Sequence, residues 1–156
     1  IEVADQYLQT RKAQPRSLLD LGCGYGYLTL NSYRWSSIEA RTATDNNAAA
    51  LLSVQKNAEQ QASSVTVIAD DCGASIEEHF DLILCNPPFH QGFDVEGDLT
   101  IKFLKRIRSA LAKGGVALVV VNMFIPVERK AADLFSKKKI EVVEDNGAFK
   151  VIALRG

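Results

Sequence analysis

Long apolar runs and paired cysteines are both missing from this sequence of 156 residues. No apolar run approaches the roughly 20 residues that a membrane-spanning helix needs, so we expect no membrane partner. The three cysteines, Cys23, Cys72 and Cys85, have no C-x-x-C spacing. This argues against a zinc site or a disulfide framework and favours a reducing, cytoplasmic location without a bound metal.

Neither sign of charge is in excess, because 18 Lys and Arg residues oppose 19 Asp and Glu residues. This balance argues against holding nucleic acid by bulk electrostatics, although it leaves room for a local basic patch. The length suits one domain, so we expect residues 1–156 to form a single monomeric domain with 1–14 as a leading helix and linker. Because the first residue is Ile1 rather than Met, we expect this domain to be a piece of a longer protein.

Short apolar runs alternate with amphipathic segments along the chain. The apolar runs predict strands at residues 17–21, 38–44, 65–69, 80–85 and 116–121. Apolar residues at helical spacing predict helices at 46–61, 97–112 and 127–135, the first capped by Asp45 or Asn46. Such alternation predicts an α/β domain with a parallel sheet covered on both faces. The Asp145-Asn146-Gly147 turn predicts a closing hairpin that adds an antiparallel strand.

A glycine-rich turn follows the first predicted strand and reads Asp20-Leu21-Gly22-Cys23-Gly24-Tyr25-Gly26. Glycine lets the backbone turn sharply and approach a ligand closely. The third glycine comes one residue too early for G-x-G-x-x-G, which disfavours a nicotinamide-dependent oxidoreductase. Asp20 precedes the turn, where a carboxylate would repel a pyrophosphate but can hold a cation such as an α-amino group.

Acidic residues also end the next two predicted strands. Asp45 ends the second strand, where a carboxylate can accept hydrogen bonds from both hydroxyls of a ribose. Asp70 and Asp71 end the third strand, and Asp71 could accept a hydrogen bond from an adenine amine. S-adenosylmethionine carries an amine, a ribose and an adenine, so the pattern predicts a site for it. The candidate cofactor-binding residues are Asp20, Gly22, Cys23, Gly24, Gly26, Asp45, Asn46, Asp70, Asp71 and Asn86.

The most specific motif is Asn86-Pro87-Pro88-Phe89, directly after the predicted strand 80–85. Proline has a fixed φ and pushes the preceding residue into an extended conformation, so two prolines make a stiff corner. The Asn86 side-chain oxygen and the Pro87 carbonyl then become two fixed acceptors for the hydrogens of an NH2 group. Phe89 adds an aromatic wall on which a planar group can stack.

A planar amine or amide nitrogen is a poor nucleophile because its lone pair is delocalised. Two acceptors on its hydrogens favour a pyramidal nitrogen and stabilise the positive charge that develops as it attacks a methyl group. Alignment of the nitrogen with the methyl carbon and the sulfonium supplies the rest of the catalysis. We therefore expect Asn86, Pro87, Pro88 and Phe89 to be catalytic, while His90 could touch the target nucleotide or brace the loop.

These residues resemble class I S-adenosylmethionine-dependent methyltransferases, and most of all the family of bacterial ribosomal RNA methyltransferases of type C, which act on guanine N2 in the small subunit. The resemblance is carried by residues 19–24, Asp45, residues 86–90, 113–115, 121–126 and 147–151. It implies a Rossmann-like, doubly wound, seven-stranded and mostly parallel sheet with an antiparallel last strand. It also implies S-adenosylmethionine as cofactor, S-adenosylhomocysteine as product, and ribosomal RNA or a ribosomal subunit as substrate. The resemblance further implies that this domain is the C-terminal, catalytic part of the longer protein. His90, Phe149 and Lys150 are the expected substrate contacts.

Three other functions remain open at this stage. An adenine-N6 methyltransferase of RNA or DNA can use the same Asn-Pro-Pro-Phe corner, and so can a glutamine-N5 methyltransferase that acts on protein. The third alternative is a non-catalytic RNA-binding domain of the same fold, against which the intact Asn86 argues.

Overall fold

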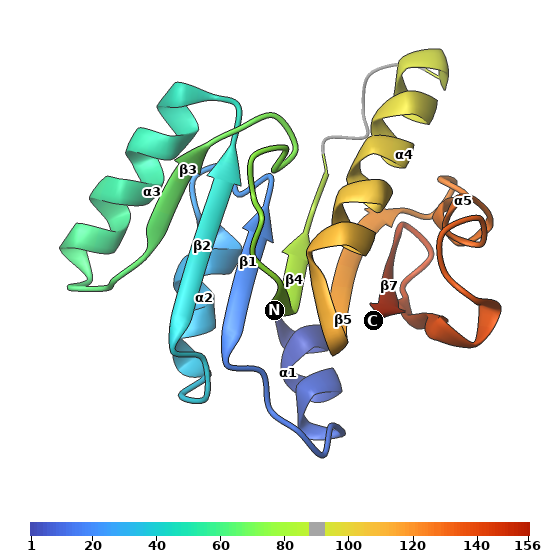
Figure 1. The fold of residues 1–156 in the computed structure, drawn as a ribbon, viewed down its shortest axis with the longest axis horizontal. Coiled ribbons are helices and arrows are strands. Elements are labelled where there is room, and N and C mark those ends of the chain that lie inside the picture. The colour runs from blue at the N-terminus through green and yellow to red at the C-terminus, as the bar shows by residue number, and fades with distance from the viewer. Residues whose placement is uncertain (88–92) are drawn as a thin grey trace.

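A computed structural model describes residues 1–87 and 93–156, with the backbone alone for 93–98. The site candidates Pro88, Phe89 and His90 therefore lie outside the described residues. Seven strands form one sheet, and helices cover both of its faces (Figure 1). This arrangement confirms the α/β, Rossmann-like fold that the alternation and the resemblance predicted.

The sheet has the strand order β3-β2-β1-β4-β5-β7-β6. Its strands are β1 Ser17–Leu21, β2 Ala40–Asp45, β3 Thr66–Ala69, β4 Phe80–Cys85, β5 Leu111–Asn122, β6 Ile140–Asp145 and β7 Phe149–Arg155. Neighbours among β1 to β5 pair in parallel, whereas β7 lies between β5 and β6 and runs antiparallel to both. The predicted antiparallel last strand is thus confirmed.

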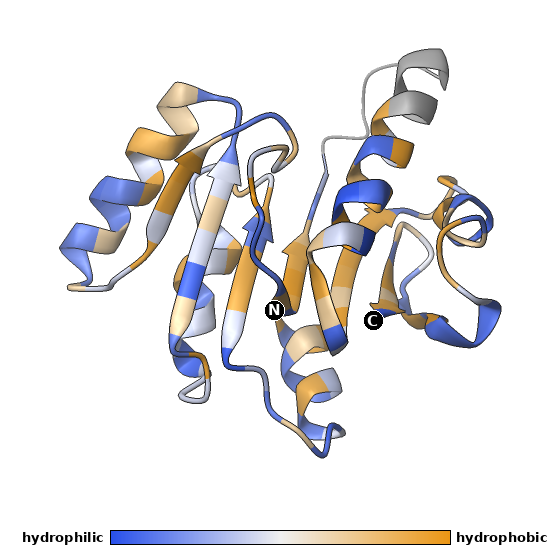
Figure 2. Ribbon diagram, in the orientation of Figure 1, coloured by the Kyte–Doolittle hydropathy of each residue, from blue (hydrophilic) through white to orange (hydrophobic). Residues whose placement is uncertain are grey.

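The helices divide between the two faces of the sheet. They are α1 Glu2–Gln9, α2 Tyr27–Asn31, α3 Ala48–Gln60, α4 Phe93–Ala110 and α5 Val127–Ala131. Successive side chains of a strand point to opposite faces. Leu18 of β1 therefore packs with Ala4 and Leu8 of α1, whereas Leu19 packs with Phe103 of α4. The hydrophobic colours of Figure 2 run along the central strands β4 and β5, which are buried between these layers.

Several details of the helices differ from the sequence-based expectation. The helix predicted over 127–135 spans only Val127–Ala131. The side chain of Asn47, rather than Asp45 or Asn46, caps α3, because its Oδ1 accepts hydrogen bonds from the amides of Ala49 (2.9 Å) and Ala50 (3.4 Å). The Asp45 carboxylate is instead bound to the glycine-rich turn. The helix predicted over 97–112 spans Phe93–Ala110, and Leu111 already pairs with Phe80 of β4.

The parallel strands end at one edge of the sheet, which positions the candidate site. The glycine-rich turn follows β1, Asp45 ends β2, Asp70 follows β3 and Asn86 follows β4. The register places Asp45 beside Ala69, and Leu21 beside both Thr44 and Cys85. These chain positions, far apart in sequence, therefore meet at one edge. Within the described ranges, no helix is long and apolar enough to cross a membrane.

Candidate active site

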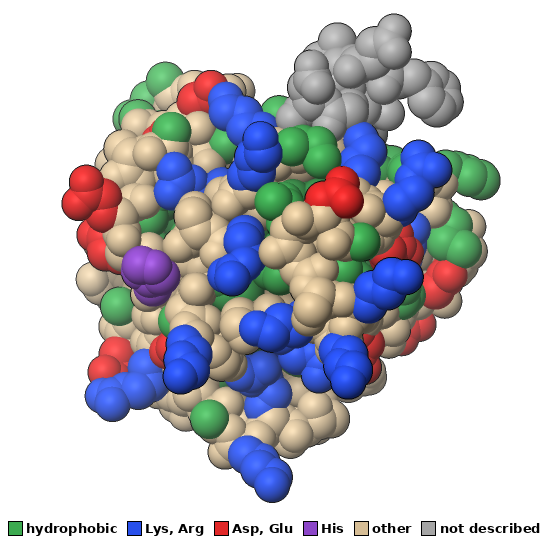
Figure 3. Space-filling model, turned by 45° about the vertical axis from the view of Figure 1, so that its right-hand side comes forward, with side chains coloured by type: hydrophobic (Ala, Val, Ile, Leu, Met, Phe, Trp, Pro, Cys, Tyr) green, Lys and Arg blue, Asp and Glu red, His purple; other side chains and the backbone are tan. Residues whose placement is uncertain are grey.

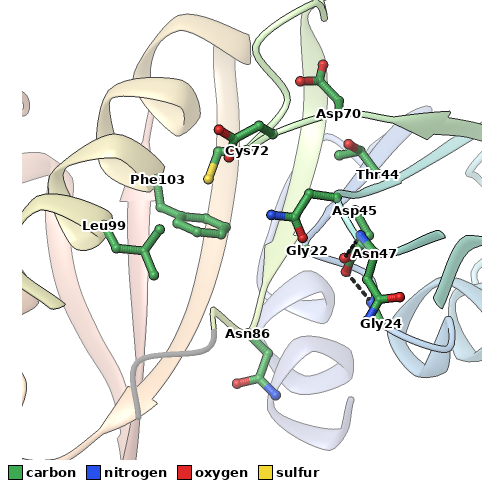
Figure 4. Close-up of a pocket in the computed structure, with 12 residues that line it drawn as sticks. Gly22, Gly24, Thr44, Asp45, Asn47, Asp70, Cys72, Asn86, Leu99 and Phe103 are labelled. Carbon is green, nitrogen blue, oxygen red and sulfur yellow. Dashed lines mark hydrogen bonds between the residues drawn. The ribbon is translucent and has the colours of Figure 1, made fainter. Parts of the chain in front are cut away.

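A hollow of about 560 Å³ lies at this edge of the sheet (Figure 4). It is lined by Gly22, Gly24, Thr44, Asp45, Asn46, Asn47, Asp70, Asp71, Cys72, Asn86, Leu99 and Phe103. Asn86 lies at the opposite end of the view from Asp70, with the glycine-rich turn and Asp45 to one side. The structure thus brings most of the predicted cofactor residues and the predicted catalytic asparagine to one cavity.

The glycine-rich turn is fixed to the end of β2 by its backbone. The amides of Gly22 and Cys23 donate to the Thr44 carbonyl at 2.9 and 3.0 Å. The Gly24 amide donates to Asp45 Oδ2 at 2.9 Å. Gly24 has a φ of +53°, and a Cβ at that position would meet no atom of the described residues within 4 Å. The turn therefore presents bare backbone to the hollow, which suits close approach of a ligand.

Asp45 is a half-buried carboxylate that already binds two backbone amides. Its Oδ2 accepts from Gly24 and its Oδ1 accepts from the Asn47 amide at 2.9 Å. An ionised carboxylate has about four acceptor sites, so both oxygens retain room for hydroxyl donors from a ligand. These amides also fix the orientation of the carboxylate before any ligand arrives.

Asp70 and Asp71 line the same hollow, but protein donors bind both carboxylates. Asp70 accepts from the amides of Ala74 (2.7 Å) and Ser75 (2.6 Å) and from the Ser75 hydroxyl. Burial opposes its ionisation, yet these hydrogen bonds outweigh burial and lower the pKa of Asp70. Asp71 forms an exposed ion pair with Lys102, whose hydrogen bond lowers the pKa of Asp71. A role of the Asp71 carboxylate toward adenine stays a prediction.

Asp20 does not line the hollow, because it is fully buried beneath the glycine-rich turn. Its Oδ2 accepts from the Thr29 amide at 2.9 Å and from the Thr29 hydroxyl at 2.5 Å. Its Oδ1 has no hydrogen-bond partner within the described part of the chain. Burial raises the pKa of Asp20 to about 6, against the opposing effect of Thr29.

This raised pKa predicts a pH-dependent stability. Between the ordinary pKa of 3.8 and the folded pKa of about 6, the folded state binds more protons at Asp20 than the unfolded state does. The contribution of Asp20 to the free energy of unfolding therefore falls as pH rises through this window, by about 3 kcal/mol in total. We expect Asp20→Asn to gain stability relative to the wild-type protein from pH 4 to pH 7, as measured by urea denaturation.

The exposed Asp133→Asn provides the control for general charge effects. Its stability relative to the wild-type protein should stay constant over the same pH range. A difference between Asp20→Asn and wild type that does not change with pH would show that folding does not raise the pKa of Asp20.

Several residues that sequence reasoning did not assign to the site also line the hollow. Leu99 and Phe103 come from α4, and the spacing of Phe103 on that helix predicts only that it is buried. A Cβ at Gly22 would lie 3.5 Å from the Phe103 ring, so the ring closes over the glycine-rich turn. Thr44 is also buried, and its Oγ1 has no hydrogen-bond partner among the described residues. Its position directly before Asp45 at a strand end was the available signal.

Asn86 stands at the end of a rigid strand. Cys85 before it is fully buried and Pro87 after it is buried, whereas Asn86 itself is exposed. Anchors on both sides fix the backbone of Asn86, while its exposed carboxamide can meet a substrate at the rim of the hollow. Its position on the same hollow as Asp45 is the arrangement required for transfer between a cofactor and an acceptor.

The other two predicted substrate contacts lie elsewhere. Lys150 is buried, and its Nζ donates to both carboxylate oxygens of Glu128 at 2.8 Å. Phe149 is 48% exposed and lines a separate hollow of about 290 Å³, shared with Leu84 and Val120. Neither residue lines the hollow at Asn86, so their roles as substrate contacts stay predictions.

The residues that line the hollow fit S-adenosylmethionine. Asp45 can accept from hydroxyls, and Phe103 and Leu99 offer an apolar wall for a flat ring. Within the described residues, no group of three or more His, Cys, Asp or Glu side chains is placed to hold a metal ion.

Comparisons with known proteins agree with this geometry. The family described as methyltransferase small domain matches residues 5–153. A ribosomal RNA small subunit methyltransferase C from Actinobacillus pleuropneumoniae is 32% identical over 88% of this chain and 41% of its own length. The protein of the same name from Shewanella loihica is 29% identical over 99% of this chain and 44% of its length. The chain thus spans less than half the length of these curated relatives.

A solved structure is similar over nearly the whole chain. It is the T. thermophilus 16S rRNA N2 G1207 methyltransferase, in complex with AdoMet and guanosine. It is 29% identical to this chain, with a TM-score of 0.84 over 99% of this chain and 41% of that protein. The predicted resemblance to methyltransferases of this type is therefore confirmed.

Proposed function

Since the chain belongs to the methyltransferase small domain family, we propose that it methylates the exocyclic N2 of a guanine in ribosomal RNA. The chain is an S-adenosylmethionine-dependent methyltransferase. The observation that carries the finer proposal is Asn86, which lines the same hollow as Asp45 and the glycine-rich turn. The names of the curated relatives and the guanosine bound to the T. thermophilus enzyme support guanine in ribosomal RNA as the target.

The cofactor half of the hollow would bind and orient S-adenosylmethionine. Asp45 would accept from the ribose hydroxyls, and the bare backbone at Gly24 would allow the ligand to lie against the turn. Phe103 and Leu99 would shield the flat ring from water on the side of α4. When bound, the cofactor supplies an electrophilic methyl group on a sulfonium.

The acceptor half would activate the target amine through hydrogen bonds. The Asn86 carboxamide oxygen and the Pro87 carbonyl would each accept one N–H of the exocyclic amine. This draws the nitrogen lone pair out of the ring system and toward the methyl carbon. As this nitrogen takes the methyl group, the two oxygens would stabilise the positive charge that grows on it. Because Asn86 is exposed at the rim of the hollow, the methylated nitrogen would then lose a proton to solvent water.

Transfer of a labelled methyl group to undermethylated ribosomal subunits, followed by nucleoside analysis, tests the proposal. N2-methylguanosine is the expected product, formed only when S-adenosylmethionine is present. N6-methyladenosine as the product would replace the guanine assignment with the adenine alternative. Labelled glutamine in a ribosomal protein would replace it with the protein alternative. No label in any acceptor, with cofactor binding intact, would contradict the ribosomal substrate.

A further inference from the structure

Basic side chains are concentrated on the face of the molecule formed by α4, α5 and the segment after α5 (Figure 3). We define the basic face as Lys102, Lys105, Arg106, Arg108, Arg129, Lys130, Lys137, Lys138 and Lys139. Residues 99–110 and 127–139 thus hold nine of the 18 Lys and Arg residues of the chain. The same segments hold two of its 19 Asp and Glu residues, Glu128 and Asp133. A nearly neutral chain therefore has one strongly positive surface.

The described part of the protein neutralises only some of this charge. Glu128 is bound by the buried Lys150 at 2.8 Å, so it does not balance the neighbouring Arg129. Lys102 pairs with Asp71, and Arg106 donates to the backbone carbonyls of Ile76 and Ala74 at 2.9 Å. Both of these residues are therefore tied to the loop that follows β3.

Five members of the basic face have no such partner. Among the described residues, no ion pair or hydrogen bond of the side chain is present for Lys105, Arg129, Lys137, Lys138 or Lys139. Four of these are lysines, which can each donate three hydrogen bonds. Their charges are consequently available to an anionic partner.

Basic residues from separate elements lie close together, and part of the basic face lies next to the cofactor hollow. The Arg108 guanidinium lies 5.7 Å from the centre of the Phe135 ring, which brings the end of α4 to the segment that carries Lys137. Lys102, Lys105 and Arg106 line a shallow hollow of about 370 Å³. This hollow shares Asp71 and Cys72 with the cofactor hollow, so the basic face borders the cofactor hollow at that end.

We propose that the basic face binds the phosphodiester backbone of the RNA substrate and so positions the target nucleotide at Asn86. This inference rests on the proposed function, because it takes RNA as the substrate. Charge complementarity favours phosphate groups, since lysines act as compact positive charges that do not require a fixed acceptor geometry. The face would orient the RNA without reading its sequence, because phosphate contacts carry no base information.

The test compares two double variants with the same change in net charge. One combines Lys105→Gln with Lys138→Gln on the basic face, and its matched control combines Lys12→Gln with Lys56→Gln, two exposed lysines away from it. RNA affinity is measured against salt concentration with a ribosomal RNA fragment, in parallel with methyl transfer. The slope of log affinity against log salt should fall by about 1.4 to 1.8 in the basic-face variant, which is two phosphate contacts.

The same variant should raise the RNA KM about tenfold at moderate salt, while kcat and cofactor affinity stay unchanged. The control variant should match the wild-type protein in every measurement. An equal loss of RNA affinity in both variants would show that bulk charge, rather than this face, attracts RNA and would overturn the proposal. If the basic-face variant bound RNA as the wild-type protein does but lost binding to anionic phospholipid vesicles, the face would bind a membrane rather than RNA, and the proposal would also be overturned.

The same measurements distinguish failure of the basic-face proposal from failure of the proposed function. If the wild-type protein methylates ribosomal RNA and the basic-face variant does so with unchanged KM, only the basic-face proposal fails. If the wild-type protein binds RNA through this face but transfers no methyl group to it, the proposed function fails and the RNA-binding face stands.

Discussion

Replacement of Asn86 by alanine is expected to lower kcat about 10²- to 10³-fold, the usual cost of losing one preorganised polar group that stabilises transition-state charge. The loss should fall on kcat because the acceptor acts on charge that grows only as the nitrogen attacks. Asn86 is exposed at the rim of the hollow, away from the contacts that join Asp45 to the glycine-rich turn. Affinity for S-adenosylhomocysteine, measured by calorimetry, should therefore change less than about threefold, a small free-energy difference.

Gln60→Ala is a suitable control, because it removes an exposed carboxamide from the end of α3. Both kinetic constants and the thermal midpoint should remain at wild-type values. If Asn86→Ala instead lost cofactor affinity and turnover to the same extent, the corner after β4 would be a structural element that shapes the hollow. Unchanged turnover in this variant would remove the catalytic assignment.

The order and class of the secondary-structure elements followed from local patterns in the sequence. β4 has the predicted bounds, Phe80–Cys85, because a continuous apolar run ends there at a proline-rich corner. The predicted N-cap of α3 was wrong, because the choice between Asp45, Asn46 and Asn47 depends on the glycine-rich turn, which binds Asp45 in space. Local propensity identifies the capping residue types, but a tertiary contact selects among them.

The residues of the candidate site could likewise be predicted from the sequence only in part. Strand ends predicted the meeting of Gly22, Asp45 and Asn86, because parallel strands finish at one edge of a sheet. The spacing of Phe103 on its helix predicted only burial, since periodicity does not say which part of the core a buried side chain closes. That assignment required the position of α4 in space, which places the Phe103 ring beside Gly22.

Asp20 shows the limit of reasoning from strand ends. Its place before the glycine-rich turn predicted contact with a cationic ligand group, yet its carboxylate is fully buried and bound to Thr29. The partner lies on a helix whose orientation a sequence pattern does not specify. Among the described residues the Oδ1 retains an open acceptor for an amine, so the ligand role stays a prediction that cofactor-bound coordinates can test.

The largest loss of cofactor affinity is expected from Asp45→Ala. The variant removes the proposed acceptor for the ribose hydroxyls and also frees the Gly24 and Asn47 amides that now bind the carboxylate. Hydrogen bonds to charged groups contribute about 1.5–3 kcal/mol each, so the dissociation constant of S-adenosylhomocysteine should rise at least about 30-fold. The thermal midpoint should also fall, because the glycine-rich turn loses its attachment to β2.

Asp45→Asn separates these two effects, since the amide oxygen can keep one backbone hydrogen bond but loses the charge. It should restore most of the thermal midpoint while cofactor affinity stays at least about tenfold weaker. Asp71→Asn is the matched comparison, because the Asp71 carboxylate is exposed and paired with Lys102. A hydrogen bond from the adenine amine to this exposed carboxylate would contribute little, so we expect a loss of cofactor affinity of less than about threefold. No loss at all would remove Asp71 from the adenine, and equal affinity in Asp45→Asn and wild type would remove Asp45 from the ribose.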